Sequence, residues 1–175
     1  MKYLKTVFTL AFVALLSAGM SSCKEDEEEQ KGNTPDNGDY VDLGLSSGTK
    51  WKTTNEENSA NAEHDYFTYD EAMSRFGDKL PSKDQCIELI NECEWTWTGS
   101  GYNITGSNGK SITMPAMGFY SYDYGNVNLY GKDGIYWSST PYDENRAWII
   151  GFKANNKYVD VQTRKNGYPV RLVKD

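Results

Sequence analysis

Histidine is scarce in this chain, which has a single one, His64, among 175 residues. Histidine-ligated metal sites and Ser-His-acid triads need such a residue beside other ligands or a nucleophile. His64 lies in a polar, loop-like segment, and neither a phosphate loop nor a Gly-x-Ser-x-Gly pattern is present. We therefore expect no enzyme, no cofactor and no metal. A hydrolase built on paired carboxylates is the weaker alternative.

Basic charge is also in deficit, with 18 Lys and Arg against 25 Asp and Glu and a net charge of −7. No basic stripe runs along the chain, as a surface that follows a phosphate backbone would require. Nucleic acid is therefore not an expected partner.

A long hydrophobic run is missing as well, because the apolar stretch Val7–Leu16 is too short to span a membrane. Lys2 and Lys5 precede it and small residues follow it, which is the order of an export signal. Cys23 then follows Met-Ser-Ser, a sequence that resembles a lipobox. We predict a signal peptide over residues 1–22 and a membrane partner reached through a lipid on Cys23.

The next segment, residues 23–39, has the composition of a tether. Lys24–Glu29 is a block of mostly acidic charge that repels itself, and Gln30–Asp39 has no apolar residue. One interpretation of this acidic run is a solvated spacer with no other role. The run also resembles the surface-export signal of Bacteroidetes-type lipoproteins, which implies a lipid-anchored outer-membrane location facing the cell exterior. Residues 40–175 remain for one folded domain of ordinary size.

The last forty residues of the domain predict an antiparallel sheet. Runs rich in β-branched and aromatic residues are separated by Asn, Gly, Pro and Asp. Period-2 alternation assigns a core-facing set to each of the later runs. The runs are Ile135–Ser138, Ala147–Phe152, Tyr158–Gln162 and Val170–Val173, and the expected core residues are Trp148, Ile150, Phe152, Val159, Val161, Val170 and Leu172.

Two helices are predicted upstream by capping boxes, in which Thr68 and Ser82 are each followed three residues later by Glu or Gln. The first should stop at Gly77. The second should pack an apolar face on the sheet, formed by Cys86, Ile87, Leu89, Ile90 and Cys93. Seven helical residues separate its two cysteines by about 10 Å, so they should remain buried thiols unless the helix ends before Cys93.

Short strands account for most of the remaining domain. An opening hairpin is expected from Tyr40–Leu43 and Thr49–Thr53, and a three-stranded meander from Glu94–Thr98, Tyr102–Thr105 and Ser111–Met114. Both tryptophans of the Trp-Thr-Trp stripe at 95–97 point to one face. That stripe favours core packing over a sugar platform.

Residues 118–134 mix tyrosine, asparagine and glycine without apolar periodicity, so we expect a long surface loop. Loops on a rigid sheet are common binding sites. We predict that this loop gathers with 140–146, 154–157 and 164–168 at one end of the sheet. The candidate ligand-binding residues are Tyr120, Tyr122, Tyr124, Tyr142, Asn145, Arg146, Asn155, Asn156 and Tyr168.

Several segments together resemble the Fibrobacter succinogenes major paralogous domain. They are YVDLGLSSGTKW at 40–51, LPSKDQCIELINECEWTWT at 80–98, ITMPAMGF at 112–119, GIYWSST at 134–140 and the terminal YPVRLV. That family is similar to the C-terminal domain of the Legionella collagen-like adhesin. The resemblance implies an α+β, C-type-lectin-like fold, with antiparallel sheets and two helices, in surface lipoproteins. It does not imply an enzyme.

The sequence also departs from these relatives. Family members commonly have a cysteine at the position of Thr54, which could reach the cysteine that ends the long helix. The Glu-Pro-Asn and Gln-Pro-Asp triplets of calcium-dependent lectins are absent, and no cysteine follows Cys93, where formylglycine-generating enzymes have a pair. Two functions then remain open. One is a binding or adhesion module for a glycan or for a host or bacterial surface protein, and the other is a structural surface protein or assembly subunit.

Overall fold

The computed structural model describes residues 39–59 and 64–175. The predicted signal peptide, Cys23 and nearly all of the tether lie outside these residues. The chain divides into two units, Met1–Asn33 and Thr34–Asp175, and the second unit holds everything described below. No helix in the described part is both long and apolar enough to cross a bilayer.

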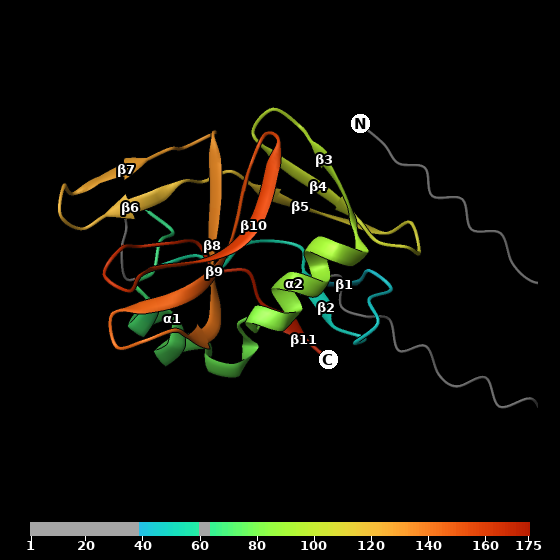
Figure 1. Cartoon of the computed structure of the whole chain (residues 1–175), viewed down its shortest axis with the longest axis horizontal. Helices are drawn as coiled ribbons and strands as arrows, with labels where there is room; N and C mark the ends of the chain where they lie inside the picture. The colour runs from blue at the N-terminus through green and yellow to red at the C-terminus, as the bar shows by residue number, and fades with distance from the viewer. Residues whose placement is uncertain (1–38, 60–63) are drawn as a thin grey trace, which may run out of the picture. The chain divides into compact units, whose positions relative to one another are not determined.

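The described unit has an α+β fold, as the sequence predicted. Its helices are α1 (Tyr69–Phe76) and α2 (Lys83–Glu92), with a 3-10 turn, η1 (Gly77–Lys79), between them. All strand ladders in the described part are antiparallel (Figure 1).

The central sheet has the order β10-β9-β8, from β10 (Asn156–Thr163), β9 (Arg146–Lys153) and β8 (Asp133–Pro141). The prediction that Val170–Val173 joins this sheet is wrong. Instead β11 (Val173–Lys174) pairs with β2 (Lys50–Lys52), which also pairs with β1 (Tyr40–Asp42). Strand propensity is a local property of the residues. The strand with which Val170–Val173 pairs depends instead on the path of the chain after β10.

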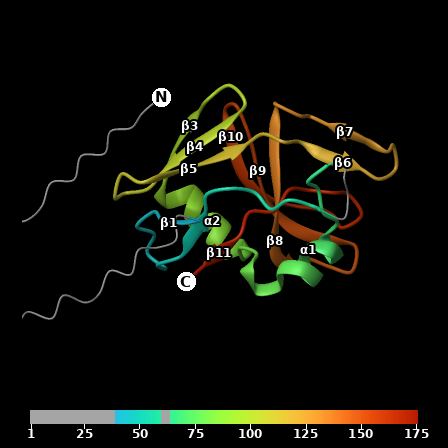
Figure 2. The same ribbon diagram turned by 180° about the vertical axis from the view of Figure 1, so that it is seen from behind.

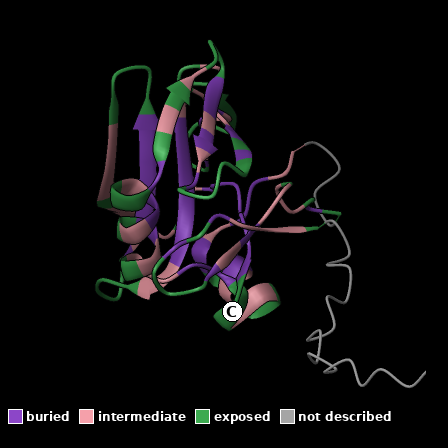
Figure 3. Cartoon of the chain, turned by 90° about the vertical axis from the view of Figure 1, so that its right-hand side faces the viewer, coloured by how far each residue is buried: buried purple, intermediate pink, exposed green. Residues whose placement is uncertain are grey.

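The central sheet is buried on both faces, which explains the nearly continuous apolar run of β9. Ile150 and Phe152 belong to one core cluster, whereas Ala147 and Ile149 belong to another on the opposite face. Helix α2 contacts the sheet over β9 and β10, and α1 contacts β8. In Figure 3 the buried class follows the middle of β8 and β9, whereas β10 has no buried residue.

Two residues expected in the core lie at its margin. Trp148 and Val161 are only half-buried and belong to neither cluster. The Nζ of Lys83 lies 3.8 Å from the centroid of the Trp148 ring, so this tryptophan covers the start of α2 rather than filling the interior.

Both helices begin as predicted. The Thr68 side chain accepts from the Glu71 amide, and the Glu71 carboxylate accepts from the Thr68 amide. Gly77 ends α1 with a φ of 51°, a backbone conformation that favours glycine. Ser82 and Gln85 form the same reciprocal pair at α2.

One face of α2 packs as predicted, with the exception of Ile87. Cys86 and Leu89 are fully buried and Ile90 is half-buried, but Ile87 is 36% exposed. At 100° per residue, Ile87 turns away from the face that Cys86 and Leu89 share. The helix ends at Glu92, one residue before Cys93, so the unbroken helix on which the thiol prediction depended is not present. Cys86 and Cys93 are nonetheless buried, free thiols.

The meander is also confirmed, as β3 (Glu94–Trp97), β4 (Gly101–Thr105) and β5 (Ser111–Pro115). Trp95 and Trp97 both pack edge-on against Tyr102, with ring centroids 5.3 and 5.0 Å apart. Trp95 also meets Phe152 of the central sheet. The stripe therefore joins the meander to the core, as the packing interpretation predicted.

The segment 118–134 contains a hairpin and is not the continuous loop that was expected. Strands β6 (Phe119–Ser121) and β7 (Asn126–Asn128) pair with each other. The backbone of Tyr120 exchanges two hydrogen bonds with Gly167, which attach the hairpin to the segment after β10. Because the outer side chains of this hairpin are solvated, its strands carry no apolar alternation, and the pattern search misses them.

Candidate ligand-binding cleft

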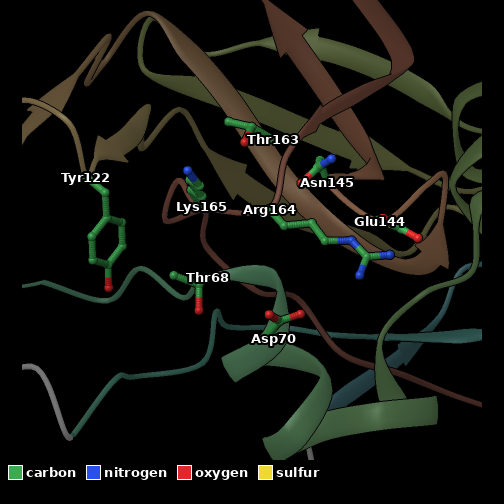
Figure 4. A pocket seen from close by; sticks show the side chains of 8 residues that line it. All are labelled: Thr68, Asp70, Tyr122, Glu144, Asn145, Thr163, Arg164 and Lys165. Atoms are coloured by element: carbon green, nitrogen blue, oxygen red, sulfur yellow. The ribbon is translucent and has the colours of Figure 1, made fainter.

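A cleft of about 470 Å³ opens where α1, the β6–β7 hairpin, the β8–β9 connection and the end of β10 meet. These elements are distant in sequence, and Figure 4 shows their side chains around one hollow. The lining residues are Thr68, Asp70, Tyr122, Glu144, Asn145, Thr163, Arg164 and Lys165.

The start of α1 contributes the acidic side of the cleft. Thr68 and Glu71 satisfy each other through the capping box, so the cap does not require the Asp70 carboxylate. Asp70 is exposed, and within the described residues its carboxylate has neither a hydrogen bond nor an ion pair. It is therefore available to accept from a ligand, and a carboxylate in the first turn also suits the helix dipole.

Arg164 is held in place by backbone and ring contacts. Its amide donates to the Asn145 carbonyl at 2.9 Å, and its own carbonyl accepts from the Tyr69 amide at 3.2 Å. The guanidinium carbon lies 4.7 Å from the centroid of the Tyr69 ring. Burial raises the pKa of Tyr69, and the nearby Arg164 opposes that rise. Arg164 thus joins α1 to β10 and presents a fixed cation at the cleft.

Tyr122 forms the aromatic wall. Its side chain is 49% exposed, and its ring meets that of Tyr120 edge-on, with centroids 5.4 Å apart. Burial, Glu71 and Tyr120 together raise the pKa of Tyr122, so its hydroxyl remains protonated and can donate. In Figure 4 the ring stands across the cleft from Arg164, beside Thr68.

Of the predicted binding residues, Tyr122 and Asn145 line this cleft. Arg146 lies nearby but is engaged locally, because its Nε and Nη2 donate to Asp143 at 2.8 and 2.7 Å. Those bonds lower the pKa of Asp143. The guanidinium also covers the ring of Tyr142 at 4.7 Å. This cluster shapes the β8–β9 connection rather than lining the cleft.

The expectation that all candidate loops lie at one end of the sheet is wrong. Connections between successive antiparallel strands alternate between the two ends, so the β9–β10 turn is opposite the β8–β9 turn. Asn155 and Asn156 therefore line a separate groove of about 380 Å³, with Trp97, Lys132 and Asp133 among its other residues.

The remaining predicted binding residues lie in the core or in the β6–β7 hairpin. Tyr168 is 1% exposed and packs edge-on against Trp137 at 4.6 Å, so its prediction as a binding residue is wrong. The position of Tyr168 after a loop suggested that it is exposed. Its β-bridge to Phe67 instead places it in the interior. Tyr120 is half-buried beneath Tyr122, and Tyr124 is 82% exposed but lies outside the cleft lining.

Sequence reasoning missed Thr68, Asp70 and Thr163 and did not single out Glu144, Arg164 or Lys165. The capping box could have marked the start of α1, but nothing local indicated that it meets the end of β10. The resulting cleft combines an aromatic ring with carboxylates, cations, an amide and hydroxyls. No group of three potential metal ligands occurs among the described histidine, cysteine, aspartate and glutamate residues.

A family model described as a domain of unknown function (DUF8237) matches residues 80–173. The chain belongs to this family. The DUF8237 segment contains most of the cleft lining, from Tyr122 to Lys165, whereas Thr68 and Asp70 precede it. No curated protein and no solved structure matches the chain.

The DUF8237 segment also carries a buried arginine, Arg171, which is 1% exposed. Its Nε donates to the Asn55 side chain, and its Nη atoms donate to the carbonyls of Lys52 and Thr113, at 2.8 to 2.9 Å. Burial lowers its pKa, and the neighbouring Tyr136 acts in the opposite direction. These bonds tie the end of the family segment to β2 and β5, so Arg171 is part of the fold rather than of the cleft.

Proposed function

We propose that this protein is a lipid-anchored, cell-surface binding protein whose cleft takes a glycan without catalysing its cleavage. The observation that carries the proposal is the half-exposed ring of Tyr122 beside polar side chains that lack partners among the described residues. These are Asp70, Glu144, Asn145, Thr163 and Lys165.

A sugar presents both donors and acceptors from each hydroxyl, together with an apolar C–H face. The cleft offers carboxylate acceptors, cationic and amide donors, and an aromatic wall, which is the mixture that fixes such a ligand. Two carboxylates, from Asp70 and Glu144, balance the cations of Arg164 and Lys165. This balance favours a ligand without strong net charge.

The test is a glycan array followed by titration of any glycan that binds. Tyr122→Ala and Asn145→Ala should each weaken binding by at least about fivefold, roughly 1 kcal/mol, because each removes a side chain that lines the cleft. Tyr124→Ala is the matched control, since it removes a more exposed tyrosine of the same hairpin outside the cleft.

Glycan binding that survives both cleft variants would contradict this site. Capture of a surface protein through Tyr122 and Asn145, with no glycan bound, would favour the adhesion alternative. A chain that binds neither would favour the structural alternative. Release of sugar fragments, lost in Asp70→Asn or Glu144→Gln, would instead favour a hydrolase, because these carboxylates share the cleft.

The location and the finer fold class belong to the same proposal. The lipobox-like sequence before Cys23 and the acidic run after it support a lipid anchor and display outside the outer membrane. The similarity to the Fibrobacter succinogenes major paralogous domain supports a C-type-lectin-like arrangement of the antiparallel sheets and two helices. An experimental structure compared with C-type lectins would test this fold assignment.

A further inference from the structure

Strand β7 has an open outer edge. The two-stranded sheet contains only β6 and β7, and among the described residues no other strand pairs with β7. Both views of the fold place β7 on the outside of the hairpin (Figures 1 and 2). An open strand edge exposes backbone donors and acceptors that another strand can use.

The hydrogen-bond pattern identifies which residue presents that edge. Tyr120 faces Val127 in the ladder, and the amide and carbonyl of Tyr120 both bond to Gly167, at 2.8 and 2.9 Å. Because antiparallel pairs alternate between bonded and non-bonded types, the amide and carbonyl of Val127 point away from β6. Val127 therefore presents one donor and one acceptor at the outer edge.

The sequence of this edge is nearly palindromic about the same residue. Residues 124–130 read Tyr-Gly-Asn-Val-Asn-Leu-Tyr, with Val127 at the centre. In an antiparallel pair of two copies centred there, Val127 meets Val127 and Asn126 meets Asn128, which are the residues of β7. The two Val127 backbones then exchange both hydrogen bonds across a twofold axis, as an isologous interface requires.

The edge lacks the charge and the proline that protect many strand edges from pairing, although the short length of β7, Asn126–Asn128, limits pairing to a few residues. Residues 124–130 contain no charged residue and no proline. The side chains of Tyr124, Val127, Leu129 and Tyr130 are 82%, 40%, 44% and 71% exposed. Leu129 also has a φ of 59°, an uncommon conformation for a non-glycine residue, which directs the chain away after β7.

We propose that β7 is a self-association edge, at which two copies of this chain pair antiparallel about Val127 and form a four-stranded β6-β7-β7-β6 sheet. Two backbone hydrogen bonds and a few side chains form an interface well below the roughly 1,600 Å² of a stable complex. The dimer is therefore weak and depends on concentration. Display of many copies on one surface would raise the local concentration and favour pairing.

Site-directed cross-linking tests the register. The full chain with Cys23→Ala keeps only the buried thiols of Cys86 and Cys93 among its native cysteines. Val127→Cys in that background places two thiols on residues with Cα atoms about 5.5 Å apart, within disulfide range. Tyr124→Cys is the matched control, because Tyr124 lies in the turn between β6 and β7, outside the strand that would pair.

Under mild oxidation we expect a disulfide-linked dimer from Val127→Cys and none from the more exposed Tyr124→Cys. Sedimentation of the chain that carries no engineered cysteine should show reversible dimers. Val127→Lys should weaken dimerisation at least about tenfold, because two like charges would meet at the twofold axis. The proposal is overturned by a chain that stays monomeric to about 1 mM. It is equally overturned by equal cross-linking at both positions, or by dimers that persist in Val127→Lys.

Discussion

At the scale of single residues, the fold depends on buried polar groups that no strand or helix pattern marks. The Tyr136 hydroxyl donates to the Pro115 carbonyl at 2.7 Å and accepts from the Asn55 amide at 3.1 Å. The same Asn55 side chain accepts from Arg171. Four segments distant in sequence therefore meet in one hydrogen-bonded group, which leaves little freedom for substitution.

Tyr136 makes the stability of the domain sensitive to alkali. Burial raises its pKa from 10.0 to about 12, and Arg171 and Asn55 oppose the rise. The folded state holds the phenol proton more tightly than the unfolded state, so this contribution is complete below pH 10 and is lost as pH rises through about 12. We expect the free energy of unfolding, measured with denaturant, to fall by about 2 to 3 kcal/mol across that window from this residue.

Tyr136→Phe is the matched variant for this pH effect. It should cost about 1 kcal/mol at neutral pH through its lost hydrogen bonds, and it should make the decline above pH 10 shallower. An unchanged alkaline slope in the variant would assign the decline to other groups. Tyr66, whose pKa burial also raises to about 12, is the first of these.

At the scale of secondary-structure elements, local signals fixed the helices well. Both capping boxes were readable in the sequence, and both form in the structure. Ser82→Ala should therefore lower the free energy of unfolding by about 1 kcal/mol, because the Gln85 amide loses its acceptor at the start of α2. Denaturant unfolding measures the change.

Ser74→Ala is the control for the cap. Ser74 is exposed within α1, so alanine there should leave stability unchanged or slightly higher. Equal destabilisation by both substitutions would mean that the cap at Ser82 does not contribute specifically.

Strand pairing was less predictable than helix starts. The runs that became β8, β9 and β10 alternate clearly, and adjacent strands of this kind pair through short turns. Val170–Val173 has a similar composition, but part of it, Val173, pairs with Trp51 far away in sequence. The hairpin of β6 and β7 was missed for the opposite reason, since its exposed tyrosines and asparagines give no apolar period.

At the scale of the whole molecule, the proposed location depends on the segment before the domain. Cys23→Ala should release the protein from the membrane fraction, because an acyl anchor supplies the membrane affinity. Fractionation and the mass of the product measure this. Lipidation would be contradicted if the Cys23→Ala protein stays in the outer membrane with the same mass as the unsubstituted protein.

Deletion of Lys24–Glu29 separates anchoring from display. Lipidation should persist, and protease digestion on intact cells should decrease if the acidic run directs export to the surface. Equal digestion of both forms would assign that run to a spacer role alone.

Much of the candidate site could not be read from the sequence. Tyr122 and Asn145 were found because they occupy polar segments between strands, but Asp70 and Thr163 lie at the ends of a helix and a strand whose meeting is a tertiary event. Tyr168 was predicted to bind a ligand but is buried, because a tyrosine after a loop can pack inward as readily as outward.

The sequence by itself determined what depends on neighbours along the chain: the helix starts, the three successive strands and the meander. Tertiary structure alone decided which strand β11 joins, that the central sheet is buried on both faces, and which loops share an end. It also decided the contacts of Arg171 and the cleft around Tyr122. The physical reason is that caps, turns and periodicity act within a few residues, whereas pairing and burial join segments whose separation no local pattern records.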